Sequence, residues 1–487
     1  MAMAGSVGVK PRPHHSTPRR FLGRMSDIGT IEDASVVLSV PSSVTTDTAS
    51  PLASPTTVDT SSPIFPIEVF EHIIDECCIG EGEGWYDRES IRDDQETLLA
   101  CALTCKAWLP RSRFHILRRV AFSDTSQVFK FAHLLDAHPD MANLVQCLNV
   151  YEERAYPGRA EYTWHVFAFL MMLTRRMPVL RSLVFEGTDI HNISFDHRSI
   201  ICISAFPAIT SLSLSNAKFA SVAHLGRLIL SIPALRSLAC SEVRFWKRGF
   251  DVCDLPPQAN RLRLTSITLQ DCPNEDVVNL LLATSTGEHF ESLDVDLFAA
   301  YYGGSRLLRH SGQGLRTLRM YADGESIKDM TQQLSPCDLS HNINLKLSRE
   351  LIINDTASVP ASVWIPKLLR TVATSAMQEV TVNFVKARWM ASYSLEWKIL
   401  PPYILLSEDD CAAIDGALSR SKFARLRKFR LTLDWHVDVE PYMACFPRLL
   451  RRGILSIDAG RDSSMFGQPM RYPYYSVRKN DRRGHLK

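Results

Sequence analysis

The sequence predicts a small all-helical module followed by a solenoid of repeated strand–helix units, an α+β or α/β repeat fold with one parallel sheet. Two observations predict this fold. Residues 63–122 carry apolar side chains at helical spacing. Behind them, short alternations of apolar and polar residues recur at steps of roughly 25 to 29 residues. We therefore divide the chain into a leader at 1–62, the module at 63–122, the repeats at 123–460 and a tail at 461–487.

The totals are those of a globular protein with a sizeable core. The 487 residues are 45% hydrophobic and 22% charged. A formal net charge of +2 gives no general attraction to nucleic acid or membrane. The 12 cysteines include no Cys-x-x-Cys pattern, so neither a zinc site nor a disulfide framework is indicated. We expect no metal and no cofactor.

No apolar stretch predicts a membrane or secretory segment. The N-terminus lacks the apolar core of a signal peptide, and the longest uninterrupted apolar run, residues 166–173, is too short to span a bilayer. We expect a reduced intracellular protein, cytoplasmic or nuclear, without membrane contact.

The two ends have compositions typical of unfolded segments. The leader is rich in Ser, Thr, Pro and Ala without a sustained period, so disorder is expected. Phosphorylation or targeting remains open there, beside a plain solvated tail. The C-terminal stretch RYPYYSVRKNDRRGHLK interleaves basic residues with Tyr, as base stacking requires. The lack of a recognisable nucleic-acid fold favours a solvated basic end, so nucleic-acid binding is not expected.

The front of the module predicts a helix with one apolar stripe. Pro66 suits a first helical turn, where its missing N–H would be unpaired anyway, and Glu68 favours the same turn through the helix dipole. Ile67, Phe70 and Ile74 then recur at i, i+3 and i+7. A loop at 80–96 follows, and its interleaved glutamates exclude a phosphate cradle.

A second helix is predicted from Asp94. Apolar residues occur around so much of this helix that two of its faces must be buried. In so small a module, we expect one of these faces to contact another protein. Trp108 is the kind of rigid anchor that interface cores favour. After Pro110, Phe114, Leu117 and Val120 predict a short third helix. We expect Leu98, Ala102 and Cys105 of the second helix on the internal side, and Leu99 and Leu103 on the docking side. Rotation of the helix would exchange these two faces.

The segment resembles the F-box, the helical motif that docks the adaptor of Skp–cullin–F-box ubiquitin ligases. The ending CKAWLPRSRFHILRRVAF is similar to F-boxes of fungal proteins with repeat-rich tails. Phe65, in place of the usual Leu, and the long acidic loop depart from the family. An ordinary helical cap on the repeats is the alternative. The resemblance implies an adaptor-binding surface made of Pro66, Ile67, Glu68, Phe70, Ile73, Ile74, Leu99, Leu103, Lys106, Trp108 and Leu109.

Six clear copies of one pattern follow, among them LRSLVF, ITSLSL, LRSLAC and LRTLRM. Their central apolar residues are Leu183, Leu212, Leu238, Ile267, Leu293 and Leu318. Weaker copies lie around Leu148, Leu345, Val380, Phe429 and Leu455. The array resembles the irregular leucine-rich repeats that often follow an F-box, and each unit would bury its apolar side only by stacking on its neighbours.

The alternation predicts strands with one buried face, and VAHLGRLILSI and EDVVNLLLAT predict covering helices. Ser407 and Asp410 form a capping box for a helix through Leu418. The period is lost over residues 386–406, which indicates an insertion or a distorted repeat. Outward positions on the strands would line a concave surface. Those chosen as substrate-binding candidates are Val184, Glu186, Ser213, Asp294, Asp296, Arg319 and Tyr321.

The sequence therefore predicts a substrate receptor and no enzyme. No Walker loop, dinucleotide fingerprint, nucleophile elbow or His-Glu-x-x-His occurs. The expected partners are a Skp-type adaptor, through it a cullin, and an unknown protein substrate that the repeats hold near the ubiquitin-charged enzyme. A scaffold with the same two parts, acting outside a ubiquitin ligase, remains the alternative.

Overall fold

The chain divides into two units, Met1–Ser62 and Pro63–Lys487. A computed structural model describes only residues of the second unit. The predicted leader, the tail and the distorted stretch at 386–405 lie outside the described residues. These residues are 66–77, 88–151, 164–188, 197–247, 249, 262–270, 275–284, 289–296, 305–311, 314–322, 350–355, 365–371, 376–384, 406–433 and 439–459.

The second unit begins with three helices, α1 (Ile67–Glu76), α2 (Arg88–Thr104) and α3 (Leu109–Arg118). Helix α2 starts before the predicted Asp94, because Arg88, Glu89 and Arg92 are good helix formers. Val120, expected in the third helix, instead lies in strand β1 (Arg119–Phe122). A β-branched residue suits a strand, and Val120 pairs there with Leu148.

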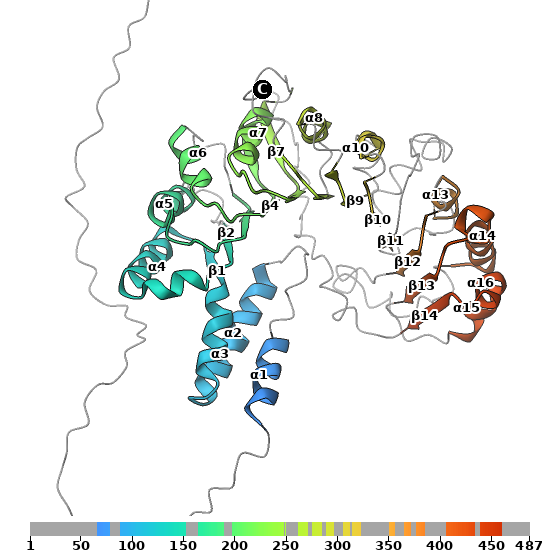
Figure 1. Ribbon diagram of the computed structural model, residues 1–487, viewed down its shortest axis with the longest axis horizontal. Helices are drawn as coiled ribbons and strands as arrows, with labels where there is room; N and C mark the ends of the chain where they lie inside the picture. Colours follow the sequence, from blue (N-terminus) through green and yellow to red (C-terminus); the bar gives the residue numbers. More distant parts are fainter. Residues whose placement is uncertain are drawn as a thin grey trace, which may run out of the picture. The chain divides into compact units, whose positions relative to one another are not determined.

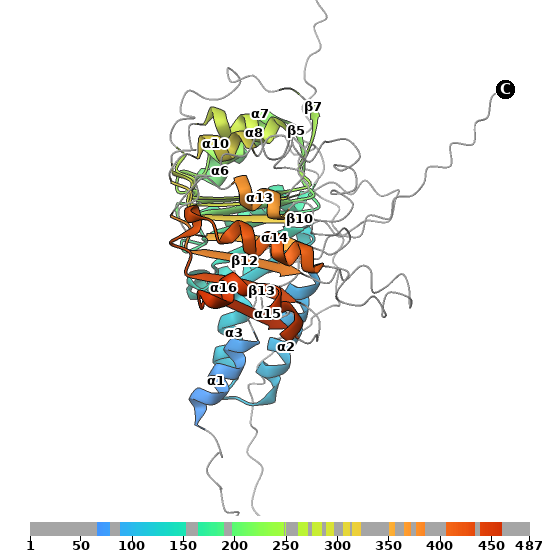
Figure 2. The same ribbon diagram turned by 90° about the vertical axis from the view of Figure 1, so that its right-hand side faces the viewer.

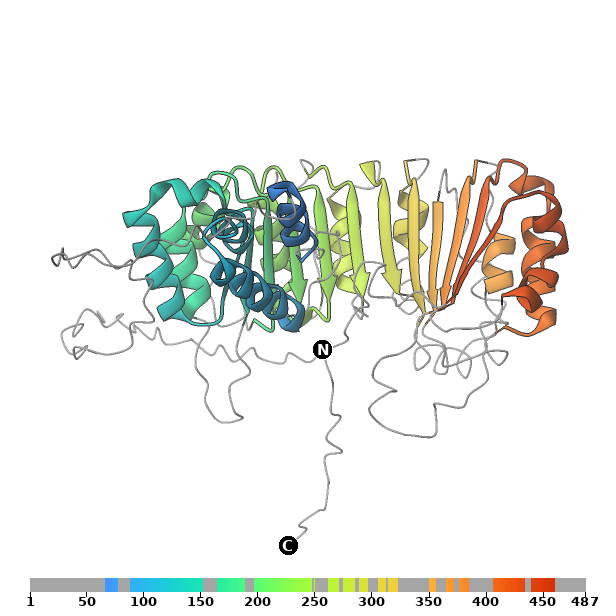
Figure 3. The ribbon, with the colours of Figure 1, turned by 90° about the horizontal axis from the view of Figure 1, so that it is seen from below.

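A parallel sheet makes up the rest of the unit. Its described strands pair in sequence order, each parallel to the next (Figures 1 and 3). This is the expected repeat solenoid, in which each unit stacks on its neighbours. The strands after β1 are β2 (Cys147–Tyr151), β3 (Ser182–Glu186), β4 (Ser211–Ser215), β6 (Ser237–Ser241), β8 (Ser266–Gln270), β9 (Ser292–Asp296), β10 (Thr317–Ala322), β11 (Glu350–Asp355), β12 (Glu379–Phe384), β13 (Lys428–Leu433) and β14 (Leu455–Ala459).

Helices cover one face of this sheet (Figure 1). The two amphipathic stretches expected to be helical form α7 and α8, and the capping box between Ser407 and Asp410 opens α14 as predicted. None of the described helices is long and apolar enough to cross a bilayer. The covering helices are α4 (Thr125–Ala137), α5 (Trp164–Leu173), α6 (His197–Ser204), α7 (Val222–Leu230), α8 (Glu275–Ala283), α10 (Ser305–His310), α13 (Ile365–Thr371), α14 (Glu408–Leu418), α15 (Glu440–Ala444) and α16 (Pro447–Arg451).

The core runs between the sheet and these helices. All six predicted central residues, from Leu183 to Leu318, are 0% exposed and face one another in register. The weaker copies at Leu148, Val380, Phe429 and Leu455 also lie in strands. The copy expected around Leu345 lies outside the described residues. In β11, between β10 and β12, Leu351 is the residue in register with Leu318 and Val380.

A second feature repeats where the strands end. Gly187, Asn216 and Glu242 directly follow β3, β4 and β6, and all three have positive φ, at 65°, 49° and 52°. Each donates its backbone N–H to the last residue of the next strand, at 2.8, 2.8 and 3.2 Å. Glycine and asparagine adopt this conformation readily, whereas glutamate is strained in it. Nearby, β5 (Lys218–Ser221) and β7 (Arg244–Lys247) form a small parallel sheet beside α7 (Figure 2).

Candidate docking surfaces on the helical module and the sheet

Aromatic packing and a small apolar interior hold the helical module together. The rings of Phe70 in α1 and Trp108 at the start of α3 lie 5.3 Å apart between centroids. Ile74 and Leu98 are 1% and 3% exposed, so they form the interior. The predicted docking role of Ile74 is therefore wrong, because its side chain packs inside the module.

An ion cluster joins α1 to α3. Arg111 donates from Nε and Nη2 to the two carboxylate oxygens of Asp75, at 2.6 and 2.7 Å. The Nε2 atom of the nearly buried His115 lies 2.8 Å from Asp75 Oδ1. The hydrogen bond from Arg111, opposed by burial and supported by His115, lowers the pKa of Asp75 to about 2. The cluster therefore links the C-terminal turn of α1 to α3 by charge-assisted hydrogen bonds.

The surface of the module is unusually apolar. Of the eleven large hydrophobic side chains that are exposed in the described part of the chain, six lie on α1, α2 and α3. Leu103 is 86% exposed, which is far above the normal value for a leucine in a stable helix pair. We call these six residues the apolar set of the module. They are Ile67, Val69, Ile73, Leu99, Leu103 and Leu109.

Most residues predicted to bind an adaptor reach solvent. Pro66, Glu68 and Lys106 are exposed, in addition to five members of the apolar set. Phe70 and Trp108 are only half-buried because they pack on each other. Val69 is also exposed, although it was not among the predicted adaptor-binding residues. Cys105, expected inside, is exposed.

The predicted substrate residues fall into two separate groups on the sheet. Val184 and Ser213 are register partners on β3 and β4, and Glu186 ends β3. Asp294 and Asp296 on β9 are register partners of Arg319 and Tyr321 on β10. Strands β6 and β8 separate the groups, so the seven residues do not form one site.

The two aspartates offer a partner little surface. Asp294 and Asp296 are 9% and 6% exposed. The Arg319 guanidinium lies 3.8 Å from the Asp294 carboxylate, so this carboxylate is engaged by its neighbour on β10. Their prediction as contact residues is corrected on this ground, and Arg319 and Tyr321, both half-buried, remain accessible.

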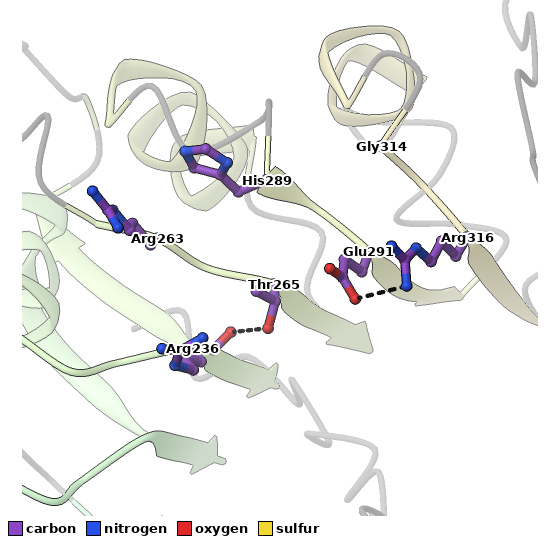
Figure 4. A pocket seen from close by; sticks show the side chains of 7 residues that line it. All are labelled: Arg236, Arg263, Thr265, His289, Glu291, Gly314 and Arg316. Carbon is purple, nitrogen blue, oxygen red and sulfur yellow. Dashed lines mark hydrogen bonds and ion pairs between the residues drawn. The ribbon is translucent and has the colours of Figure 1, made fainter.

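Two adjoining pockets, which sequence reasoning missed, lie near the starts of strands between β6 and β13. The first has a volume of about 320 Å³ and is lined by Arg236, Arg263, Thr265, His289, Glu291, Gly314 and Arg316 (Figure 4). The second, of about 550 Å³, shares Glu291 and Arg316 with it and extends to Arg427 and Lys428. We call the two together the basic groove. The signal was present in the Arg that precedes the strand in LRSLAC and LRTLRM.

Two ion pairs occupy part of the groove. Arg316 lies 3.8 Å from Glu291, and Lys428 lies 3.6 Å from Glu379. All four side chains are at least one-third exposed, so each pair is held loosely. Across the described ranges, no group of His, Cys, Asp and Glu side chains is arranged to hold a metal ion.

Comparisons with known proteins assign no family to this chain. No family model matches this sequence, and no curated protein matches it either. Among solved structures, the chain is similar to the Rad7–Elc1 complex of yeast at 12% identity, covering 82% of this chain and 89% of that one with a TM-score of 0.34. An internalin (inlF) from Listeria monocytogenes aligns at 12% identity over 69% of this chain and 95% of its own, with a TM-score of 0.22. The repeat architecture therefore rests on the strand pairing itself.

Proposed function

We propose that this chain is a substrate-recognition adaptor of a Skp–cullin–F-box ubiquitin ligase. The helical module acts as the F-box and docks a Skp-type adaptor, and the repeats bind a protein substrate. The chain itself contributes no reacting group. It accelerates ubiquitin transfer by holding the substrate close to the charged enzyme of the complex.

The observation that carries this proposal is the exposure of the apolar set. Each of its six side chains is at least 41% exposed, and an apolar surface of this kind is costly unless a partner covers it. Ile67, Ile73 and Leu109 lie at positions that match the F-box pattern in the sequence. Phe70 and Trp108, also predicted to bind the adaptor, pack on each other and are half-buried.

A second observation concerns the joint between the module and the sheet. Helix α3 ends at Arg118 and β1 begins at Arg119, with no linker residue. The Nε2 atom of Gln95 in α2 donates to the Arg119 carbonyl at 3.2 Å, and Arg119 lies 3.9 Å from Asp94. A partner on the module is therefore held rigidly relative to the repeats, as a mechanism based on proximity needs.

The test is co-purification of the full chain with a Skp-type adaptor and a cullin. An Ile67→Asp, Leu103→Asp double variant should lose the adaptor, because both changes put a charge on the proposed interface. The two side chains are 44% and 86% exposed, so folding should be unaffected. Phe129→Asp is the matched control, since Phe129 is 47% exposed but lies on α4 outside the module.

Three results would be informative. Loss of the adaptor from the double variant alone supports the proposal. Failure of the folded wild-type chain to retain any Skp-type adaptor would contradict it. Retention of the adaptor without cullin would instead favour a scaffold acting outside a ligase.

A further inference from the structure

The basic groove is built on one repeated backbone position. This position lies two residues before the central apolar residue of a strand. Its backbone carbonyl accepts a hydrogen bond from the backbone N–H of the equivalent residue before the next strand. Arg236 accepts from Thr265 at 2.7 Å, and Glu291 accepts from Arg316 at 2.8 Å. Arg427 donates its N–H in the same way to the Gln378 carbonyl at 2.8 Å. These residues therefore form one row along the sheet, one per strand.

The row and its neighbours are strongly cationic. Five Arg or Lys side chains line the groove against two carboxylates, those of Glu291 and Glu379. The carboxylates pair with Arg316 and Lys428. Over the portion of the chain that the structure describes, Arg236, Arg263 and Arg427 form no ion pair. They are exposed, and their charge is available to a ligand.

The three arginines of the row that line the groove are evenly spaced. Arg236 precedes β6, Arg316 precedes β10 and Arg427 precedes β13, so three strand steps separate each from the next. Neighbouring strands lie about 4.8 Å apart, which puts successive arginines on the order of 14 Å apart. An extended peptide covers about 13 Å in four residues, and residues i and i+4 point to the same side.

We propose that the basic groove binds an extended acidic peptide segment of a protein partner, with carboxylate side chains four residues apart facing Arg236, Arg316 and Arg427. The guanidinium group suits a carboxylate because it offers two parallel N–H donors. The inference rests on the proposed function only in taking the peptide as part of the substrate.

The lining of the groove favours a peptide over a nucleic acid. None of the residues that line the two pockets is Phe, Tyr or Trp, whereas single-stranded nucleic acid is held by bases stacked on aromatic rings. Glu291 and Glu379 would also repel a continuous phosphate backbone, while an alternating peptide can place uncharged residues opposite them. The polar Thr265, Ser292 and Thr317 provide hydrogen-bonding groups along the path.

The experiment measures binding of synthetic peptides to the full chain by fluorescence anisotropy at low salt. The probe is a labelled Ser/Gly peptide of about 13 residues with three Asp placed four residues apart. A peptide of identical composition with the three Asp adjacent tests the spacing. The spaced peptide should bind at least about fivefold more tightly, and its affinity should fall as salt is raised.

Variants test the assignment to the row. Arg316→Ser and Arg427→Ser should each weaken binding about threefold to tenfold. Glu291→Gln should strengthen peptide binding about twofold to threefold, because it releases Arg316 from its ion pair. If Glu291 had only a structural role, its substitution would not increase the affinity. Arg181→Ser is the matched control: Arg181 is exposed and occupies the same row before β3, outside both pockets.

Several results would overturn the inference. Undetectable binding of the spaced peptide, equal affinity of the two peptides, or unchanged affinity in both arginine variants would each do so. Displacement of the peptide by a single-stranded oligonucleotide of equal charge at a lower concentration than unlabelled peptide would reassign the groove to nucleic acid. Adaptor retention, measured on the same preparations, separates these failures from a failure of the proposed function, since the apolar set lies on another part of the chain.

Discussion

Arg111 donates hydrogen bonds to both carboxylate oxygens of Asp75, at 2.6 and 2.7 Å, and this bidentate pair joins α3 to α1. Charge-assisted bonds of this geometry are stronger than neutral ones and more specific in direction. The Arg111 guanidinium also lies 5.5 Å from the centre of the Phe114 ring, which limits its freedom further. The position of α1, and with it part of the apolar set, depends on this pair.

Asp75→Asn should loosen α1 without unfolding the repeats. Asparagine is uncharged and has only one side-chain oxygen, so it can accept only one of the two hydrogen bonds from Arg111. Because both side chains are about one-third exposed, the expected loss in the free energy of unfolding is only about 1 kcal/mol. Hydrogen exchange of the α1 amides should be faster, and exchange in the sheet should not change. Glu76→Gln is the control, because Glu76 is exposed on the same helix. Unchanged exchange in α1 would show that Asp75 does not hold it.

Acid should release α1 in a defined pH window. The pKa of Asp75 falls from 3.8 to about 2 in the folded chain. A carboxyl whose folded pKa is depressed stabilises the fold fully above its unfolded pKa and loses that contribution as pH falls through the folded value. Protection of the α1 amides should therefore decline between about pH 4 and pH 2. Asp75→Asn should lack this part of the decline, and an identical decline in the variant would assign it to other carboxyls.

Truncation of one central leucine should destabilise the solenoid strongly. Leu212 is 0% exposed and lies in register between Leu183 and Leu238. Leu212→Ala should cost about 3 kcal/mol through lost burial and the cavity left behind. Ser213→Ala, at the next position on the other face, should change stability by less than about 0.5 kcal/mol. Urea unfolding followed by circular dichroism measures both, and equal shifts would contradict the assignment of faces.

Glu242→Asn should stabilise the chain. Glu242 has φ of 52° and is only 9% exposed, whereas the equivalent residue one repeat earlier is Asn216. Asparagine tolerates this conformation better, and relief of strain and of charge burial should give about 1 kcal/mol. The substitution also removes the ion pair between Glu242 and Arg244, whose charged groups lie 3.7 Å apart. Because the Arg244 side chain is 55% exposed, the loss of this pair offsets little of the gain in stability.

Thermal unfolding checks this prediction, with Asn216→Ala as the opposite case. That variant should lower the melting temperature, because alanine is strained at positive φ. A lower melting temperature for Glu242→Asn would mean that the carboxylate makes a stabilising interaction larger than the strain.

The repeat fold was predictable because its signal is local and recurs. Leu183, Leu212 and Leu238 identify their own strands through alternation and period. Leu351 was missed because the stretch before it lacks the full pattern, and Val120 because helix α3 runs into β1 without a break. Secondary-structure boundaries are where local pattern is least informative.

The docking surfaces were predictable only in part. Exposure of Leu103 and burial of Leu98 followed from the helical period. Burial of Ile74 did not, because it depends on how α1 lies against α3, which the Asp75–Arg111 pair sets. The basic groove was missed for a similar reason: Arg236, Arg316 and Arg427 lie far apart in sequence, and only stacking of the strands brings them into one row.

The direct passage from Arg118 to Arg119 has a mechanical consequence. A helix continued into a paired strand acts as a stiff lever, because bending it would break hydrogen bonds in β1 or in the last turn of α3. Torque applied to the helical module is thus transmitted to the first strands of the sheet instead of being dissipated in a hinge. Any load that pulls on α1–α3 would begin to peel the solenoid from its β1 edge.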